Sequence, residues 1–215
     1  MTAEAPGTGA PQLAGSRVVV ATANRGKLAE IRAALGFTGW EFVTAEDLDA
    51  QPLDVEETGI TFEDNARLKA HAYHAAFGLP ALADDSGLEV DILGGAPGVY
   101  SSRYAGGCCS TDAENNARLL MELEEVPAED RAARFRCVIV FLDADGNETV
   151  AAGACEGSIG FEPRGEGGFG YDPLFWPEAT PGRTMAELAM GEKNAISHRG
   201  AALQALATIL GHGTG

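Results

Sequence analysis

Residues 80–104 read PALADDSGLEVDILGGAPGVYSSRY, and this stretch decides the fold. Ala81 to Ala83 are typical of the end of a short buried strand, after which Asp84 and Asp85 interrupt the apolar pattern and a polar turn is expected. Side chains alternate between the faces of an extended chain, so one carboxylate is expected to face a ligand while the other bonds within the protein. Two ionised carboxylates about 4 Å apart repel by about 4 kcal/mol at an effective dielectric near 20, which calls for a compensating cation. Taken alone, this short motif favours a polar turn without function.

The composition is that of a globular protein, with 215 residues, 45% apolar residues and a formal net charge of −17. This length favours one domain or two closely joined lobes. The negative charge argues against nucleic acid as a partner, because backbone binding depends on clustered Lys and Arg. Residues 1–16 are predicted to form a disordered tail, and they have neither the basic start nor the apolar centre of a signal peptide. No run of about 18 apolar residues occurs, so we expect no membrane partner and a cytoplasmic protein.

The cysteines give no sign of a metal site or of redox chemistry. They have no CxxC spacing and no histidine partners at the spacing of metal ligands, so reduced structural thiols are expected. The four positions are Cys108, Cys109, Cys137 and Cys155.

A strand followed directly by a helix is predicted within residues 17–36. RVVVAT, residues 17–22, is a β-branched run typical of a strand buried on both faces. Leu28, Ile31 and Leu35 then repeat on one helical face. The intervening turn, TANRGK, is expected to point free backbone N–H groups and the positive end of the helix dipole outward, which predicts a phosphate cradle. It lacks the GxxxxGK[ST] pattern, and such a turn alone is more often simply solvated.

A second helix is predicted to begin after Thr61, where TFED has the form of a capping box. Asn65 and Lys69 lie one turn apart on the face that packs inward. Because burying an unpaired charge is costly, Lys69 needs a partner, which is either a carboxylate such as Glu57 or Asp85, or a phosphate.

The second half of the chain contains three further signals. A capping box at 111–114 begins a helix, and a hairpin turn at 143–146 joins two strands. GEGGFGYDP, residues 165–173, is too rich in glycine for regular structure and is expected to present two aromatic side chains, either to a ligand or as a flexible connector. Ser197 is predicted to cap the last helix, which leaves two cations in its first turn, opposed to the helix dipole.

Five separated stretches, taken together and in order, resemble the inosine triphosphate pyrophosphatase family. They are TANRGK (22–27), EETGITFEDNARLKA (56–70), ADDSGLEVDILGGAPGVYSSRYAG (83–106), GEGGFGYDPLF (165–175) and EKNAISHRGAAL (192–203). The resemblance implies an α/β fold with a long mixed central sheet and flanking helices, in a single domain, residues 17–212, with two lobes around a deep substrate cleft. It also implies a homodimer that uses Mg²⁺ to hydrolyse a nucleoside triphosphate to the monophosphate and pyrophosphate, with preference for ITP, XTP and their deoxy forms.

The resemblance also implies roles for individual residues. Asp85 matches the catalytic base and a magnesium ligand, Glu57 or its neighbour Glu56 matches the second metal ligand, and Lys27 and Lys69 match catalytic lysines near the phosphates. Ala23 stands where the family usually has glycine. The substrate contacts implied are Thr22, Ala23, Asn24, Arg25, Gly26, Lys27, Ser86, Phe169, Gly170, Tyr171, Asp172, Lys193, His198 and Arg199.

Base selectivity would come from hydrogen-bond donors that meet O6 of hypoxanthine, where adenine carries an amino group. The donors implied are His198, Arg199 or the backbone of the glycine-rich loop. Two other functions stay open. One is a Maf-like pyrophosphatase for other modified nucleotides, against which FGYD and SHR argue. The other is a purine nucleotide sensor without catalysis, against which the acids at 57 and 85 argue.

Overall fold

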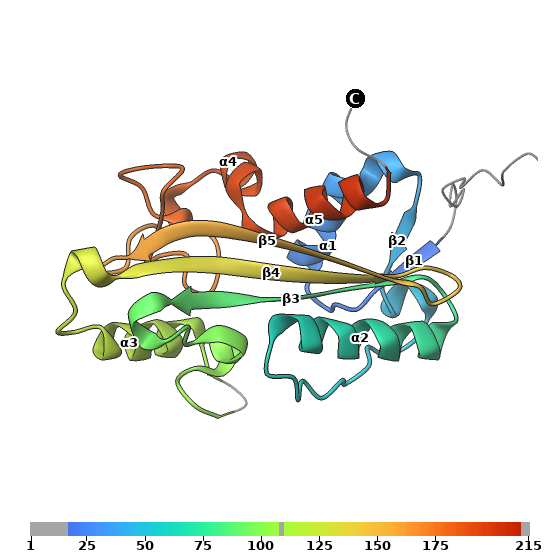
Figure 1. The fold of residues 1–215 in the computed structure, drawn as a ribbon, viewed down its shortest axis with the longest axis horizontal. Helices are drawn as coiled ribbons and strands as arrows, with labels where there is room; N and C mark the ends of the chain where they lie inside the picture. Colours follow the sequence, from blue (N-terminus) through green and yellow to red (C-terminus); the bar gives the residue numbers. More distant parts are fainter. Residues whose placement is uncertain (1–16, 108–109, 212–215) are drawn as a thin grey trace, which may run out of the picture.

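The computed structural model describes residues 17–107 and 110–211 (Figure 1). The predicted N-terminal tail and two of the cysteines, Cys108 and Cys109, lie outside the described residues. A mixed sheet in the order β2-β1-β3-β4-β5-β6 runs along the molecule, which confirms the predicted mixed central sheet. Its strands are β1 (Arg17–Val20), β2 (Glu41–Val43), β3 (Ala81–Val90), β4 (Ala132–Leu142), β5 (Glu148–Ile159) and β6 (Phe175–Pro177).

The sheet is parallel at one end and antiparallel over the rest. β1 pairs in parallel with β2 and with β3, whereas β3, β4, β5 and β6 pair antiparallel in succession. The predicted hairpin is confirmed, because β4 and β5 pair from Leu142↔Glu148 onward across the turn.

The expectation that a strand ends after Ala83 was wrong. β3 continues to Val90 and pairs with β4 from Ala81↔Leu142 to Val90↔Ala133. The long antiparallel partner satisfies the backbone along this whole length, so two charged side chains can stay inside the strand if each finds partners on its own face.

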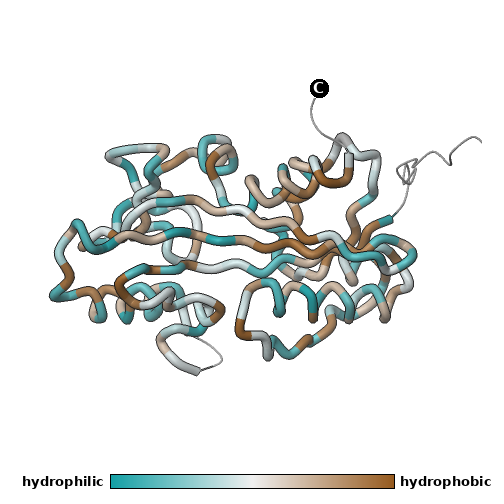
Figure 2. The backbone as a smooth tube through the Cα atoms, in the orientation of Figure 1, coloured by the Kyte–Doolittle hydropathy of each residue, from teal (hydrophilic) through white to brown (hydrophobic). Residues whose placement is uncertain are grey.

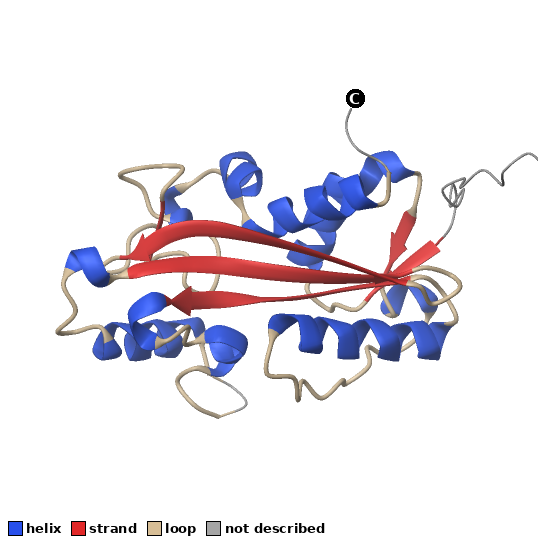
Figure 3. Cartoon of the chain, viewed as in Figure 1, coloured by secondary structure: helices blue, strands red, loops and turns tan. Residues whose placement is uncertain are grey.

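Helices cover both faces of the sheet (Figure 3). In that view α1 (Arg25–Leu35), α4 (Met190–Ile196) and α5 (His198–Ile209) lie above the strands, and α2 (Phe62–Phe77) and α3 (Asp112–Glu122) lie below them. Short 3₁₀ helices complete the fold, at Gly36–Thr38, Glu46–Leu48, Asp91–Leu93, Gly98–Arg103, Ala128–Asp130 and Met185–Glu187.

The predicted helix starts are confirmed by their caps. The hydroxyl oxygens of Thr61, Thr111 and Ser197 accept from backbone N–H groups in the first turns of α2, α3 and α5. These bonds satisfy donors that a helix start otherwise leaves unpaired.

The core is divided among several apolar clusters. α1 and α5 pack Ile31 and Leu206 against Phe141, and α2 packs small residues such as Ala66 against Val140 on the other face. In Figure 2 the half of β4 nearest β1 is strongly hydrophobic, in agreement with these buried side chains. A separate cluster around Phe175 fills the far end of the sheet.

Two further predictions concern cysteines and membranes. Cys137 and Cys155 are buried free thiols, as predicted for structural cysteines. Among the helices of residues 17–107 and 110–211, none is both long and apolar enough to cross a membrane.

Candidate active site

The site lies where β1 leaves the sheet beside β3. β1 pairs with β3 only at Val19↔Ala81 and Val20↔Leu82, after which the chain turns into α1. Within the described residues no strand continues beside this edge of β3 from Asp84 to Leu88. The polar segment of β3 therefore has one open edge, next to the turn that begins α1.

Asp84 faces α1 and α5 and is held by two cations. Its Oδ2 accepts from Lys27 Nζ at 3.0 Å and from Nε and Nη2 of Arg199 at 3.2 Å each. Burial alone would raise the pKa of Asp84, but Lys27 and Arg199 reverse this effect and hold the pKa below its usual value. The compensating cation predicted for the acidic pair is thus confirmed.

Arg199 links this carboxylate to α1. The side chain is 3% exposed, and its Nη1 donates to Glu30 Oε2 at 2.5 Å while Nη2 also donates to Ser86 Oγ at 3.3 Å. Sequence reasoning missed Glu30, although it lies one turn after Lys27 on α1 and therefore on the same face. All three guanidinium nitrogens are engaged inside the protein, so the predicted contact of Arg199 with a nucleotide stays a prediction.

Asp85 points to the opposite face, where Lys69 joins it to a second carboxylate. Lys69 Nζ lies 2.9 Å from Glu57 Oε1 and 3.1 Å from Asp85 Oδ1. Asn65 donates to Asp85 Oδ2 at 3.3 Å and accepts from Gly59 N–H at 2.8 Å, so it ties the segment before α2 to β3. The prediction that Lys69 pairs with Glu57 or Asp85 is confirmed for both, and Asn65 is a site residue that the sequence marked only as inward-facing.

The pKa of Asp85 is raised. Burial raises it and the nearby Glu57 adds to this, whereas Lys69 and Asn65 oppose the shift without cancelling it. A carboxylate with a raised pKa beside a lysine has the properties of a general base.

Two carboxylates meet at this cluster, and Glu57 is the one that accompanies Asp85. Glu56 is exposed and, among residues 17–107 and 110–211, its side chain makes no bond that reaches the cluster, whereas Glu57 is half-buried with Arg103 Nη1 at 3.8 Å. Within the described residues no group of three or more Asp, Glu, His or Cys side chains could hold a metal ion. Mg²⁺ commonly takes only one or two protein carboxylates and completes its shell with water and substrate phosphates, so this donor pair fits Mg²⁺.

The turn before α1 differs from its prediction in one respect. Asn24 Oδ1 accepts from the N–H groups of Gly26 at 2.8 Å and Lys27 at 3.2 Å, and its own N–H donates to Thr22 Oγ1 at 3.0 Å. The expectation of free backbone N–H groups was therefore wrong for Gly26 and Lys27, because the asparagine caps the helix. Ala23 is exposed.

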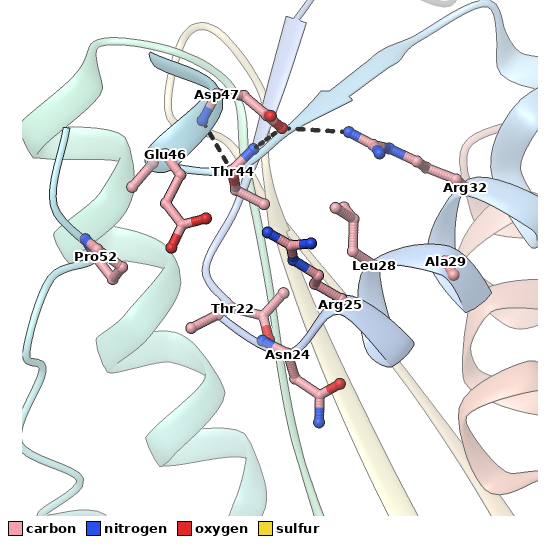
Figure 4. A pocket seen from close by; sticks show the side chains of 12 residues that line it. Thr22, Asn24, Arg25, Leu28, Ala29, Arg32, Thr44, Glu46, Asp47 and Pro52 are labelled. Atoms are coloured by element: carbon pink, nitrogen blue, oxygen red, sulfur yellow. Dashed lines mark hydrogen bonds and ion pairs between the residues drawn. The ribbon is translucent and has the colours of Figure 1, made fainter. Parts of the chain in front are cut away.

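A cavity of about 620 Å³ borders this turn (Figure 4). The Arg25 guanidinium points into it, and Asp47, bonded to Thr44 and Arg32, lies at the far side. Lys27, Asp84 and Asp85 do not line it, so the cavity is separate from the carboxylate cluster.

The glycine-rich loop presents one of its two aromatics. Phe169 is 50% exposed, and Lys193 Nζ lies 4.6 Å from its ring centre and 2.5 Å from Asp172 Oδ2. Tyr171 is buried and donates its hydroxyl to the Ser101 carbonyl at 2.8 Å. The expectation of two freely presented aromatics was wrong for Tyr171, because that hydroxyl found a partner in a distant segment.

His198 is neutral, contrary to the expected cation at the start of α5. The imidazole is buried and stacks on Phe135 with ring centres 5.1 Å apart. Burial, and then the charge of Arg199, lower the pKa of His198 to about 3. The charge of Asp84 opposes this shift, whereas those of Lys193 and Lys27 add to it.

Three comparisons identify similar proteins. The model of the Ham1 family matches residues 18–209. A protein of Geobacter sulfurreducens named dITP/XTP pyrophosphatase is 53% identical over 196 residues, which covers 91% of this chain and 97% of the relative. A protein of Thermus thermophilus with the same name is 50% identical over 195 residues, with 90% and 91% covered. The solved structure of a HAM1 protein from Coxiella burnetii has a TM-score of 0.83 and 45% identity, and the match covers 91% of this chain and 98% of that one.

Proposed function

The chain belongs to the Ham1 family, and on this premise we propose that it hydrolyses ITP, XTP and their deoxy forms to the monophosphate and pyrophosphate. It is a nucleoside triphosphate pyrophosphatase, a hydrolase of the α–β phosphoanhydride bond. Its role would be to remove deaminated purines from the nucleotide pool. The single observation that carries the proposal is the cluster in which Lys69 joins Glu57 to Asp85.

The reaction we propose needs a base, a positive environment and an oriented water. Asp85 would accept a proton as the water attacks the α-phosphorus, and pyrophosphate would leave as the bond to the bridging oxygen breaks. Lys27 and Lys69 would stabilise the negative charge that grows on the phosphate oxygens. The buried pair of Asp84 and Arg199 would hold β3 and α5 in register beside these groups.

Glu57 and Asp85 would hold Mg²⁺. When bound, the ion would supply neutralisation of phosphate charge beyond what the lysines provide. Lys69 balances the charge of the two carboxylates, and Asn65 keeps the Asp85 carboxylate oriented.

The base would be recognised at the glycine-rich loop. The exposed face of Phe169 offers a stacking surface for the base. Lys193 lies beside it, and its ammonium has three N–H donors, of which the bond to Asp172 uses one. A donor facing O6 of hypoxanthine or xanthine would be left opposite an amino group in adenine, which is costly in a closed pocket. The roles predicted for Gly170, Tyr171, His198 and Arg199 belong to this same proposal.

Three broader properties belong to the proposal. We expect a homodimer as the working state, a small nucleoside triphosphate as the ligand rather than nucleic acid, and the cytoplasm as the location.

The experiment that tests the function measures products from ITP, XTP, dITP, GTP and ATP, with and without Mg²⁺. Pyrophosphate and orthophosphate are assayed separately. The expected result is pyrophosphate from the deaminated purines only, and only with Mg²⁺. Orthophosphate, or turnover of GTP and ATP at the same rate, would contradict the proposal. If none of these purines is cleaved but a modified pyrimidine triphosphate added to the panel is, the Maf-like alternative would be favoured. If ITP binds tightly and stays intact for hours with Mg²⁺, a sensor would be favoured.

Matched variants locate the chemistry within that assay. Asp85→Asn is expected to abolish turnover without unfolding the protein. Glu57→Gln is expected to raise the Mg²⁺ concentration needed for half-maximal rate by about tenfold or more, whereas Glu56→Gln leaves it unchanged. Equal effects of the two glutamate variants would overturn the assignment of Glu57.

A further inference from the structure

The glycine-rich loop is tied down on both sides of its tip, because Gly167 N–H donates to the Ala186 carbonyl at 3.1 Å and the Tyr171 hydroxyl donates to the Ser101 carbonyl at 2.8 Å. Gly165, Gly168 and Gly170 have φ angles of +84°, +78° and +62°, a region that glycine enters without steric cost. Within the loop, Phe169 N–H donates to the Asp172 carboxylate at 2.9 Å. The tip of such a loop needs an outside partner if it is to hold one conformation.

Helix α3 supplies that partner at Gly170. The Gly170 N–H donates to Asp112 Oδ2 at 2.6 Å, and Asn116 Nδ2 donates to the Gly170 carbonyl at 2.9 Å. Asp112 and Asn116 are four residues apart and so lie on one face of the helix. The capping box of Thr111 and Glu114 fixes the turn that carries Asp112. Both backbone groups of one peptide position are therefore bound by one helix.

A cavity of about 450 Å³ is lined by residues of both α3 and the loop, so the two segments are not closely packed over that area. Asn116 is 9% exposed, and its Oδ1 has no hydrogen-bond partner in the part of the chain that the structure describes. A buried unpaired amide oxygen costs about 1–3 kcal/mol, so a leucine would serve the stability of α3 better. What Asn116 contributes, and leucine could not, is the hydrogen bond from its Nδ2 to the Gly170 carbonyl.

We propose that Asp112 and Asn116 are positioning residues for purine recognition. By binding Gly170 they hold the adjacent Phe169 beside Lys193 and keep its exposed face in place for a base. The inference rests on the proposed function, because it assigns the loop to the purine.

The expected kinetic effect is on substrate binding. A loop that is not held must be ordered when the substrate binds, and this ordering weakens affinity. Asp85 and Lys69 lie on other elements, so the chemical step is largely spared. Loss of the hydrogen bonds from Asp112 and Asn116 to Gly170 therefore raises KM and leaves kcat nearly unchanged.

Asn116→Leu tests this most sharply, because it removes the donor and the unpaired oxygen together and keeps the number and branching of the side-chain heavy atoms. The KM for ITP should rise about five- to tenfold, with kcat within about twofold and an unchanged or higher melting temperature. Asp112→Ala should raise KM in the same way. Asp112→Asn keeps an acceptor for the Gly170 N–H and should therefore have the KM of the unmodified protein. Arg118→Ala, on the exposed side of the same helix, serves as the control. An unchanged KM in Asn116→Leu would overturn the inference, whatever the melting temperature of the variant.

Hydrogen exchange without substrate separates this inference from the proposed function. The backbone of residues 168–171 should exchange faster in Asn116→Leu and in Asp112→Ala than in the unmodified protein or in Arg118→Ala. Equal exchange in all four proteins would show that α3 does not order the loop through Gly170, whatever the substrate is. Faster exchange in a protein that yields no pyrophosphate from any deaminated purine would instead overturn the function, and with it the role in purine recognition.

Discussion

Asp84 and Asp85 are adjacent in β3 and have opposite electrostatic environments. Lys27 and Arg199 stabilise the charged form of Asp84. Burial of Asp85, by contrast, disfavours its charged form more than Lys69 favours it. The same substitution at the two positions should therefore change stability in opposite directions.

Asp84→Asn is expected to lower the free energy of unfolding by about 3 kcal/mol at pH 7, because it takes the carboxylate partner from the half-buried Lys27 and leaves the buried Arg199 with Glu30 alone. The pKa of Asp84 is lower in the folded state, so its contribution is present above the unfolded pKa near 4 and is lost as pH falls further. Urea unfolding of variant and unmodified protein between pH 3 and pH 8 measures this. If the difference in free energy of unfolding between the two proteins stays constant down to pH 3, the prediction is contradicted.

Asp85→Asn is expected to leave stability at pH 7 unchanged or higher while turnover is lost. Because the pKa of Asp85 is raised on folding, its ionised form disfavours the folded state, and this cost appears as pH rises from about 4 through the raised pKa. The same unfolding series checks it, and a clear loss of stability at pH 7 would show that Asp85 is a structural ion-pair partner. Active sites commonly trade stability for function in this way.

At the scale of elements, the placement of Arg199 depends on how closely α5 approaches β5. A Cβ added at Gly153 of β5 would lie 2.4 Å from both Ala202 N and His198 O of α5. The glycine therefore permits a contact between backbones that any side chain would block.

Gly153→Ala is expected to push α5 outward, to destabilise the fold by about 1–3 kcal/mol and to reduce turnover through displaced Arg199. Gly191→Ala is the matched control, since it lies inside α4 with no atom within 4 Å of the added Cβ. Alanine there should stabilise the helix by about 1 kcal/mol or leave it unchanged. Urea unfolding and the pyrophosphate assay measure both, and equal stability of the two variants would refute the close-approach argument.

At the scale of the whole molecule, the net charge of −17 opposes association of two copies. We expect a homodimer at physiological salt, with a mass near twice 22.3 kDa, and dissociation when the salt is lowered. The physical reason is screening, because the Debye length grows from about 10 Å at 0.1 M to about 30 Å at 0.01 M. Sedimentation velocity at the two salt concentrations checks this, and a monomer at both would contradict it.

Local chemistry made several parts of this protein predictable. The starts of α2, α3 and α5 follow from Thr61, Thr111 and Ser197, because a cap forms with backbone groups only two or three residues away. The β4–β5 hairpin follows from its turn residues and alternating pattern. The family was recognisable because five motifs stand in order along one chain.

The sequence by itself determined the starts of α2, α3 and α5, the β4–β5 hairpin and the family, and it pointed to Asp85, Glu57 and Lys69 as one cluster, although it missed Glu30. Only the tertiary structure decided that β3 runs through its acidic pair, that Glu57 rather than Glu56 joins Asp85, that Tyr171 is buried, and that His198 is neutral. Each of these depends on a partner far along the chain or on burial by another element. A capping or turn signal acts within a few residues and can be read from order alone, whereas the state of a buried charge is set by neighbours that only folding brings together.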